Sequence, residues 1–162
     1  MADSISDIKK ELRFLEPEKL IEVCLKLAKY KKENKELLAY LLFESGNETA
    51  FIEKIKTDMD AQFEYLHTYN SNLLKKGLRK ILRITDKYIK FSGQKQTETE
   101  LRIHFCHNIQ RNQLPLERHL VLSNIYNRQL DKINKSILLL HEDLQYDFRK
   151  DFEKLSRFEM LY

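Results

Sequence analysis

The longest regular pattern in the chain is a stripe of apolar residues near the C-terminus, spaced three and four residues apart. Its members are Tyr126, Leu130, Ile133, Ile137, Leu140, Leu144, Phe148, Phe152, Leu155 and Phe158. This spacing places one side chain per turn on a single helix face, so the pattern predicts helix over the whole stretch. We predict one long helix or two, with a joint near residues 141–143, and a second helix that covers the stripe.

The same spacing recurs in the first third of the chain. A first helix is predicted to begin at a cap formed by Ser4 or Ser6, and a second at Pro17, because proline suits the first helical position. Asn34 is expected to cap a third helix. Gly46 is expected to end that helix in a left-handed conformation.

Three further helix boundaries follow from local signals in the middle of the chain. Residues 70–72 are predicted to separate a fourth helix from a fifth, although one long kinked helix also fits, and Gly93 is predicted to close the fifth. Thr97 followed by Glu100 has the spacing of a capping box and predicts the start of a sixth helix. This helix should end before Pro115, which disfavours helical geometry in the residue that precedes it.

The composition agrees with an all-helical protein. Only three glycines and two prolines interrupt 162 residues, and strong helix formers fill most of the chain. We therefore predict an all-α fold of six to eight antiparallel helices with a long C-terminal helical segment, forming one domain over residues 1–162. Stacked αα-hairpins in a short right-handed solenoid and a helical bundle both fit, and we favour the stacked hairpins.

The net charge of +4 is unevenly distributed. Residues 1–72 carry 11 Lys and Arg against 14 Asp and Glu, whereas residues 73–96 carry 8 against 1. The rest of the chain balances at 10 against 10. The excess positive charge is therefore concentrated in the predicted fifth helix.

Five basic residues of this helix fall at steps of three and four. They are Lys76, Lys80, Arg83, Lys87 and Lys90, and we call them the basic stripe. A row of cations along one helix edge can bind a phosphate backbone without reading its sequence, or can bind anionic lipid headgroups. The alternative, which we favour, is a solvated face or one that pairs with acidic residues of the first half.

Glu100, His104 and His107 project from one side of the predicted sixth helix, a spacing that could hold a divalent transition metal. A further ligand could come from His67, from His119 or from His141. A polar helix face that happens to contain imidazoles is the simpler interpretation, because no second pair at ligand spacing accompanies it. We predict no metal and no other cofactor.

The sequence also lacks the signatures of several protein classes. It contains no nucleophile elbow and no glycine-rich phosphate loop, so we predict that the protein is not an enzyme. Cys24 and Cys106 lie within helical apolar patterns, as reduced core thiols do. No apolar run is long enough for a membrane span and the first residues do not form a signal peptide, so we expect a cytoplasmic protein.

Three leucine-rich segments, at residues 8–27, 36–43 and 140–148, resemble small bacterial helical proteins grouped as a domain of unknown function. The resemblance implies an array of αα-hairpins. It implies no substrate and no site residue.

These observations predict a non-enzymatic helical scaffold that binds a protein partner or a second copy of itself. The expected surface is a groove or an incompletely covered helix face, and the long C-terminal stripe motivates it. The alternative is non-specific binding of nucleic acid through the basic helix at residues 73–91.

Overall fold

The computed structural model describes residues 4–159 and the side chains of residues 4–157. Within these residues it contains eight α-helices and no strand, so the all-α prediction is confirmed. The helices are α1 (Ile5–Arg13), α2 (Pro17–Tyr30), α3 (Lys32–Ala39), α4 (Glu48–Glu64), α5 (Ser71–Ser92), α6 (Lys95–Arg111), α7 (Leu120–Ile137) and α8 (Glu142–Glu159). None of these helices is long and apolar enough to cross a membrane.

The backbone groups into two compact units, Met1–Glu44 and Ser45–Tyr162. The first, called the N-terminal unit below, contains α1, α2, α3 and a π-helical turn at Tyr40–Glu44. The second, called the C-terminal unit, contains α4 to α8. Whether the two units unfold together as the single predicted domain stays a prediction.

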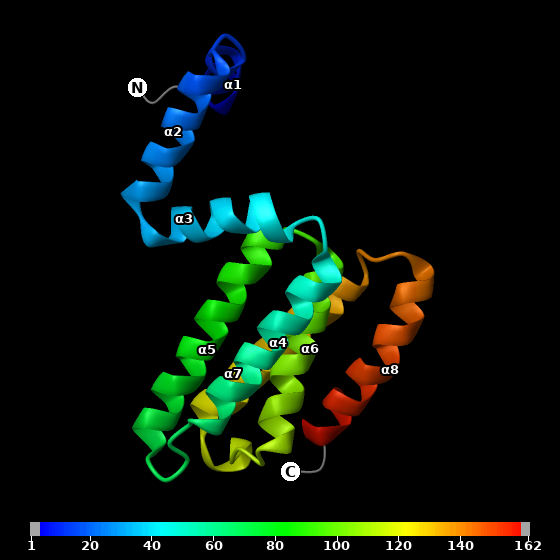
Figure 1. Cartoon of the computed structure of the whole chain (residues 1–162). Helices are drawn as coiled ribbons and strands as arrows, with labels where there is room; N and C mark the ends of the chain where they lie inside the picture. The colour runs from blue at the N-terminus through cyan, green and yellow to red at the C-terminus, as the bar shows by residue number, and fades with distance from the viewer. Residues whose placement is uncertain (1–3, 160–162) are drawn as a thin grey trace. The chain divides into compact units, whose positions relative to one another are not determined.

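The C-terminal unit is built around α6. This helix packs against α4, α5, α7 and α8, and successive helices of the unit run in alternating directions (Figure 1). Most sides of α6 are therefore buried, and its buried apolar side chains are Leu101, Ile103, Phe105, Cys106 and Ile109. A central helix with four neighbours is typical of a helical bundle. The stacked-hairpin solenoid stays a prediction.

The C-terminal stripe is divided between two helices that pack against each other. The chain leaves the helix after Ile137 and re-enters it at Glu142, close to the predicted joint. Both α7 and α8 also contact α6, so the stripe is largely covered within the unit. Its fully or nearly buried members are Tyr126, Leu130, Ile133, Ile137 and Leu155. The side chain of Phe158 lies outside the described residues. Leu140, Leu144, Phe148 and Phe152 are half-buried, so the expectation that this stripe leaves a face for a partner stays a prediction.

Local signals placed several helix ends correctly. Ser4 caps α1 by accepting a hydrogen bond from the backbone N–H of Asp7 at 3.2 Å. Asn70 caps α5 in the same way, so the fourth and fifth helices are separate. Pro17 opens α2, and Gly93 ends α5 in the left-handed region at a φ of 66°.

Three predicted helix ends are wrong. Two of the expected cap residues lie inside a helix and hydrogen-bond to distant groups, and one glycine lacks the expected backbone conformation. Helix α3 already includes Asn34, whose side-chain amide donates to the carbonyl oxygen of Leu27 at 2.9 Å. Helix α6 already includes Thr97, whose hydroxyl donates to the carboxylate of Glu48 at 2.6 Å. Gly46 does not adopt a left-handed conformation, since Gly93 is the only glycine among the described residues with a positive φ.

Buried polar side chains of α6 tie it to its neighbours. Arg102 is 4% exposed and donates to Asp86 of α5 at 2.8 Å, to Gln129 of α7 at 2.8 Å and to Glu98 one turn earlier at 3.1 Å. A buried guanidinium is tolerated when its charge and its N–H groups find such partners. These contacts fix how α5, α6 and α7 sit against one another within the unit.

Candidate functional site

The basic stripe lies on the outward side of α5. The opposite side of this helix is buried, through Leu74, Leu78, Ile81, Thr85 and Ile89. Four members of the stripe are exposed, namely Lys76, Lys80, Arg83 and Lys90. The fifth, Lys87, is half-buried, and its ammonium lies 4.7 Å from the centre of the Tyr88 ring. The amphipathic pattern thus assigned the two sides of this helix correctly.

The four exposed cations of the stripe form no ion pair with any residue that the structure describes. Several other cations of the C-terminal unit do, as Lys56 does with Glu100 at 3.1 Å and Arg111 with Asp60 at 3.3 Å. An ammonium or guanidinium that has no partner within the protein is available to bind an external anion. The exposed stripe is therefore a candidate surface for binding polyanions.

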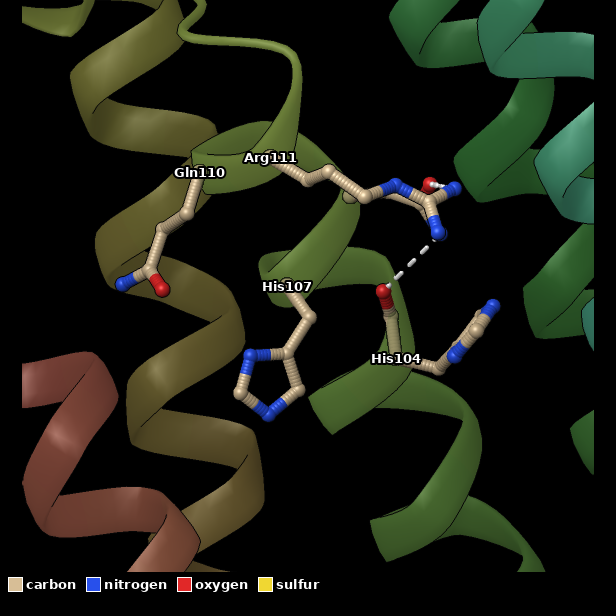
Figure 2. Close-up of a pocket in the computed structure, with 5 residues that line it drawn as sticks. His104, His107, Gln110 and Arg111 are labelled. Atoms are coloured by element: carbon tan, nitrogen blue, oxygen red, sulfur yellow. Dashed lines mark hydrogen bonds between the residues drawn. The ribbon is translucent and has the colours of Figure 1, made fainter.

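The three candidate metal ligands do not converge. The side chain of Glu100 accepts a hydrogen bond from Lys56 of α4 at 3.1 Å, and His104 Nε2 lies 2.6 Å from Asp60 Oδ1, also on α4. Figure 2 shows that His104 and His107 point away from each other. No group of three or more His, Cys, Asp or Glu side chains among the described residues could hold a metal ion.

Asp60 explains the orientation of His104. Its carboxylate accepts from Asn108 Nδ2 at 2.8 Å and lies 3.3 Å from the guanidinium of Arg111, besides its contact with His104. Partial burial raises the pKa of Asp60, but the hydrogen bonds from Asn108 and His104 and the charges of His104 and Arg111 outweigh it and lower the pKa overall. This carboxylate joins α4 to α6, which is a structural role.

His107 occupies a different environment on the same helix. Burial lowers its pKa, and only the charge of Asp151 on α8 opposes that effect, while the charges of His104 and Lys154 lower it further. A half-buried imidazole that favours its neutral form is consistent with packing between helices.

A shallow hollow of about 420 Å³ surrounds these side chains at the C-terminal end of α6. It is lined by His104, His107, Asn108, Gln110 and Arg111 (Figure 2). Most of its polar groups already have partners within the protein, as Gln110 does by donating to the hydroxyl of Tyr126 at 2.9 Å. Burial raises the pKa of the nearby Cys106 thiol, so this cysteine stays protonated and unreactive. The side chains that line the hollow are therefore engaged mainly in contacts within the protein.

Most of the exposed large apolar side chains that the structure describes, 13 of 20, lie in the N-terminal unit. Helices α1, α2 and α3 contain no buried residue, although each has an apolar face. Thirteen large apolar or aromatic side chains of this unit are between 36% and 83% exposed. In α1 the face consists of Ile5, Ile8 and Leu12, at 81%, 45% and 38% exposed. An exposed apolar surface of this extent marks a contact surface in a folded protein.

An apolar groove runs between α2 and α3 within this unit. It has a volume of about 280 Å³, and its lining residues are Cys24, Leu27, Ala28, Asn34, Leu37, Leu38 and Leu41. Helices α2 and α3 pack directly against each other, but the groove between them remains open. Sequence reasoning predicted helices over these residues but did not identify this groove. The signal it overlooked is that forty-four residues alone offer too few partners to bury three amphipathic helices.

No protein-family model, no curated protein and no solved structure matches this chain.

Proposed function

We propose that the protein is a non-enzymatic helical scaffold that self-associates through the exposed apolar faces of its N-terminal unit. The observation that supports the proposal is the absence of any buried residue in α1, α2 and α3. Hydrophobic burial is the main favourable contribution to association, so these faces gain free energy when a second surface covers them.

The exposed apolar area is of the same order as one side of a standard protein interface. Burying one Leu, Ile or Phe side chain at about 25 cal/mol per Å² contributes about 1.5–3 kcal/mol, which corresponds to roughly 60–120 Å². Thirteen side chains, exposed by 36% to 83%, together offer roughly 450–900 Å² of apolar surface. A standard protein interface buries about 800 Å² per partner.

The charge of the N-terminal unit favours a second copy as the partner. Residues 1–44 carry nine Lys and Arg and nine Asp and Glu, a net charge of zero, whereas residues 45–162 carry 20 against 16. Two copies of a neutral surface with interspersed charges do not repel each other, and each charge can find an opposite one. A partner that binds through its charge would instead require a surface on which one sign of charge predominates.

The test is the mass of the purified chain in solution over a range of concentrations, measured by light scattering and sedimentation. We expect a dimer or larger assembly that dissociates when Ile21→Glu and Leu27→Glu are combined, because both side chains are more than half exposed on α2. Leu120→Glu is the matched control, since Leu120 is an exposed apolar residue of the C-terminal unit, at 76%. A monomer at every concentration contradicts self-association, and an unchanged assembly in the double variant contradicts the assigned surface.

A second candidate function is non-specific binding of nucleic acid through α5. It is favoured by the four exposed cations of the basic stripe that form no ion pair among the described residues. If four phosphates are contacted, affinity for duplex DNA should fall roughly a hundredfold between about 50 mM and about 200 mM salt. The variant Lys80→Glu with Arg83→Glu should abolish retention of labelled RNA and DNA, whereas Arg149→Glu with Lys150→Glu, the same charge change on α8, should not.

A further inference from the structure

We infer that the nucleic-acid surface extends beyond α5, across the hollow at the start of α6, onto a second row of cations on α7. This inference rests on the second candidate function and names further residues that would hold the phosphate backbone. It comes from three observations within the C-terminal unit: the pattern of α7, the lining of the hollow and the distribution of ion pairs.

Helix α7 carries its own basic row. Arg128, Lys132 and Lys135 lie at steps of four and three on one side of the helix, and all three are exposed. The other side is buried, through Leu122, Ile125, Tyr126, Gln129, Leu130, Ile133, Ser136 and Ile137. The exposed side also holds one acid, Asp131, so it has a net charge of +2. It is thus a basic face of the same kind as that of α5, although shorter.

The hollow joins the two rows. It has a volume of about 480 Å³, and three lysines from three different helices line it: Lys90 of α5, Lys95 of α6 and Lys132 of α7. Lys90 is the last member of the basic stripe, and Lys132 is the middle member of the α7 row. Seven of its nine lining residues are charged or polar, and the cations among them suit an anion better than an apolar ligand.

Two carboxylates in the hollow are already neutralised by cations of the protein. Asp86 accepts a hydrogen bond from Arg102 at 2.8 Å, and Glu98 accepts from Arg102 at 3.1 Å and from Lys95 at 2.8 Å. Burial raises the pKa of Glu98, but its bonds to Lys95 and Arg102 outweigh this and lower the pKa, so the carboxylate stays ionised and paired. Lys90 and Lys132 form no such pair among the described residues, and they leave the hollow with an uncompensated charge of +2.

Ion pairing in the C-terminal unit distinguishes the cations of α5 and α7 from those of the other helices. Many basic residues outside α5 and α7 pair with carboxylates, among them Lys56, Lys95, Arg102, Arg111, Arg118, Lys154 and Arg157. None of Arg128, Lys132 and Lys135 forms an ion pair with a described residue. The charge available to an external polyanion is therefore concentrated on the two helices that flank this hollow. A phosphate backbone offers the matching row of negative charges.

The test compares three double charge reversals in the full chain: Arg128→Glu with Lys132→Glu on α7, Lys80→Glu with Arg83→Glu on α5, and Arg149→Glu with Lys150→Glu on α8 as the control. Each changes the net charge by the same amount, and circular dichroism checks that each variant folds. Binding of labelled single-stranded RNA and duplex DNA is measured by fluorescence anisotropy at several salt concentrations. Anionic phospholipid vesicles serve as a second probe.

We expect the α7 variant to bind at least tenfold more weakly than the unmodified chain. Its salt dependence for duplex DNA should fall by about two counterions, because two phosphate contacts are lost. Weakened binding in the α5 variant with unchanged binding in the α7 variant overturns this inference and leaves the second candidate function intact. Unchanged binding in both variants, or binding to vesicles without binding to nucleic acid, overturns both.

Discussion

Replacing Arg102 by methionine should destabilise the C-terminal unit more than any surface change. The guanidinium is 4% exposed and holds Asp86, Glu98 and Gln129 at 2.8 to 3.1 Å. Methionine keeps the unbranched aliphatic part of the side chain, but it is shorter than arginine and donates no hydrogen bond. The substitution leaves two carboxylates and one buried amide without their shared partner.

The size of the effect follows from how exposed the abandoned groups are. Removing one partner of a fully buried ion pair costs about 3–5 kcal/mol. Here the side chain of Asp86 is 33% exposed and can be solvated, and Glu98 keeps its ion pair with Lys95 at 2.8 Å. Gln129 is 2% exposed, so water cannot replace the hydrogen bond that its side chain loses. We therefore expect a loss near the lower end, about 3 kcal/mol.

Urea unfolding followed by circular dichroism measures this loss. Arg128→Met on α7 is the matched control, because Arg128 is exposed and forms no ion pair with a described residue, and it should change stability by less than about 0.5 kcal/mol. A loss below about 1 kcal/mol for Arg102→Met would show that the three contacts add little to the unit.

Three further measurements test the packing of the chain. Burial lowers the pKa of His107 below its value in the unfolded chain, so the unfolded chain binds a proton first as the pH falls below about 6.5, and the protein loses stability there. His107→Gln should therefore reduce the stability that is lost between neutral and mildly acidic pH. An unchanged dependence of stability on pH contradicts this. Gly93→Ala should lower the stability measured by urea unfolding by about 1 kcal/mol, because the φ of Gly93 is +66°. Gly46→Ala should be neutral or slightly stabilising, because no atom lies within 4 Å of the added methyl group. Equal effects of the two variants would show that the left-handed conformation is not the cause. Native-state hydrogen exchange should show the least protection in α1 to α3, since they contain no buried residue, and protection equal to that of α6 would contradict the separation into two units.

Helix formation could be predicted from the sequence because its signals are local. The caps at Ser4 and Asn70, the start at Pro17 and the end at Gly93 each depend on one side chain and the backbone within three or four residues of it. Where a distant partner competes, the local prediction is wrong. Thr97 was expected to cap α6, but its hydroxyl bonds Glu48, forty-nine positions earlier, and lies inside the helix.

The candidate sites also depend partly on local sequence pattern and partly on the packing of distant helices. The amphipathic pattern determined that Lys76, Lys80 and Arg83 lie on the outward side of α5, because the buried side of a helix is fixed by its own periodicity. It could not determine whether those cations are already paired. Nor could it reveal that Lys132 meets Lys90 across a hollow, since the two residues are brought together only by the packing of α5, α6 and α7.

By itself the sequence determined that this protein is helical, where several of its helices begin or end, and which side of α5 is charged. Tertiary structure alone decided which apolar faces are covered. The C-terminal stripe, which the sequence left in need of a partner, is largely covered because α7 and α8 pack on each other and on α6. The faces of α1 to α3, which have the same periodicity, remain exposed. The physical reason is that periodicity is a property of one helix, whereas burial requires a second surface, and nothing local in the chain specifies which surface that is.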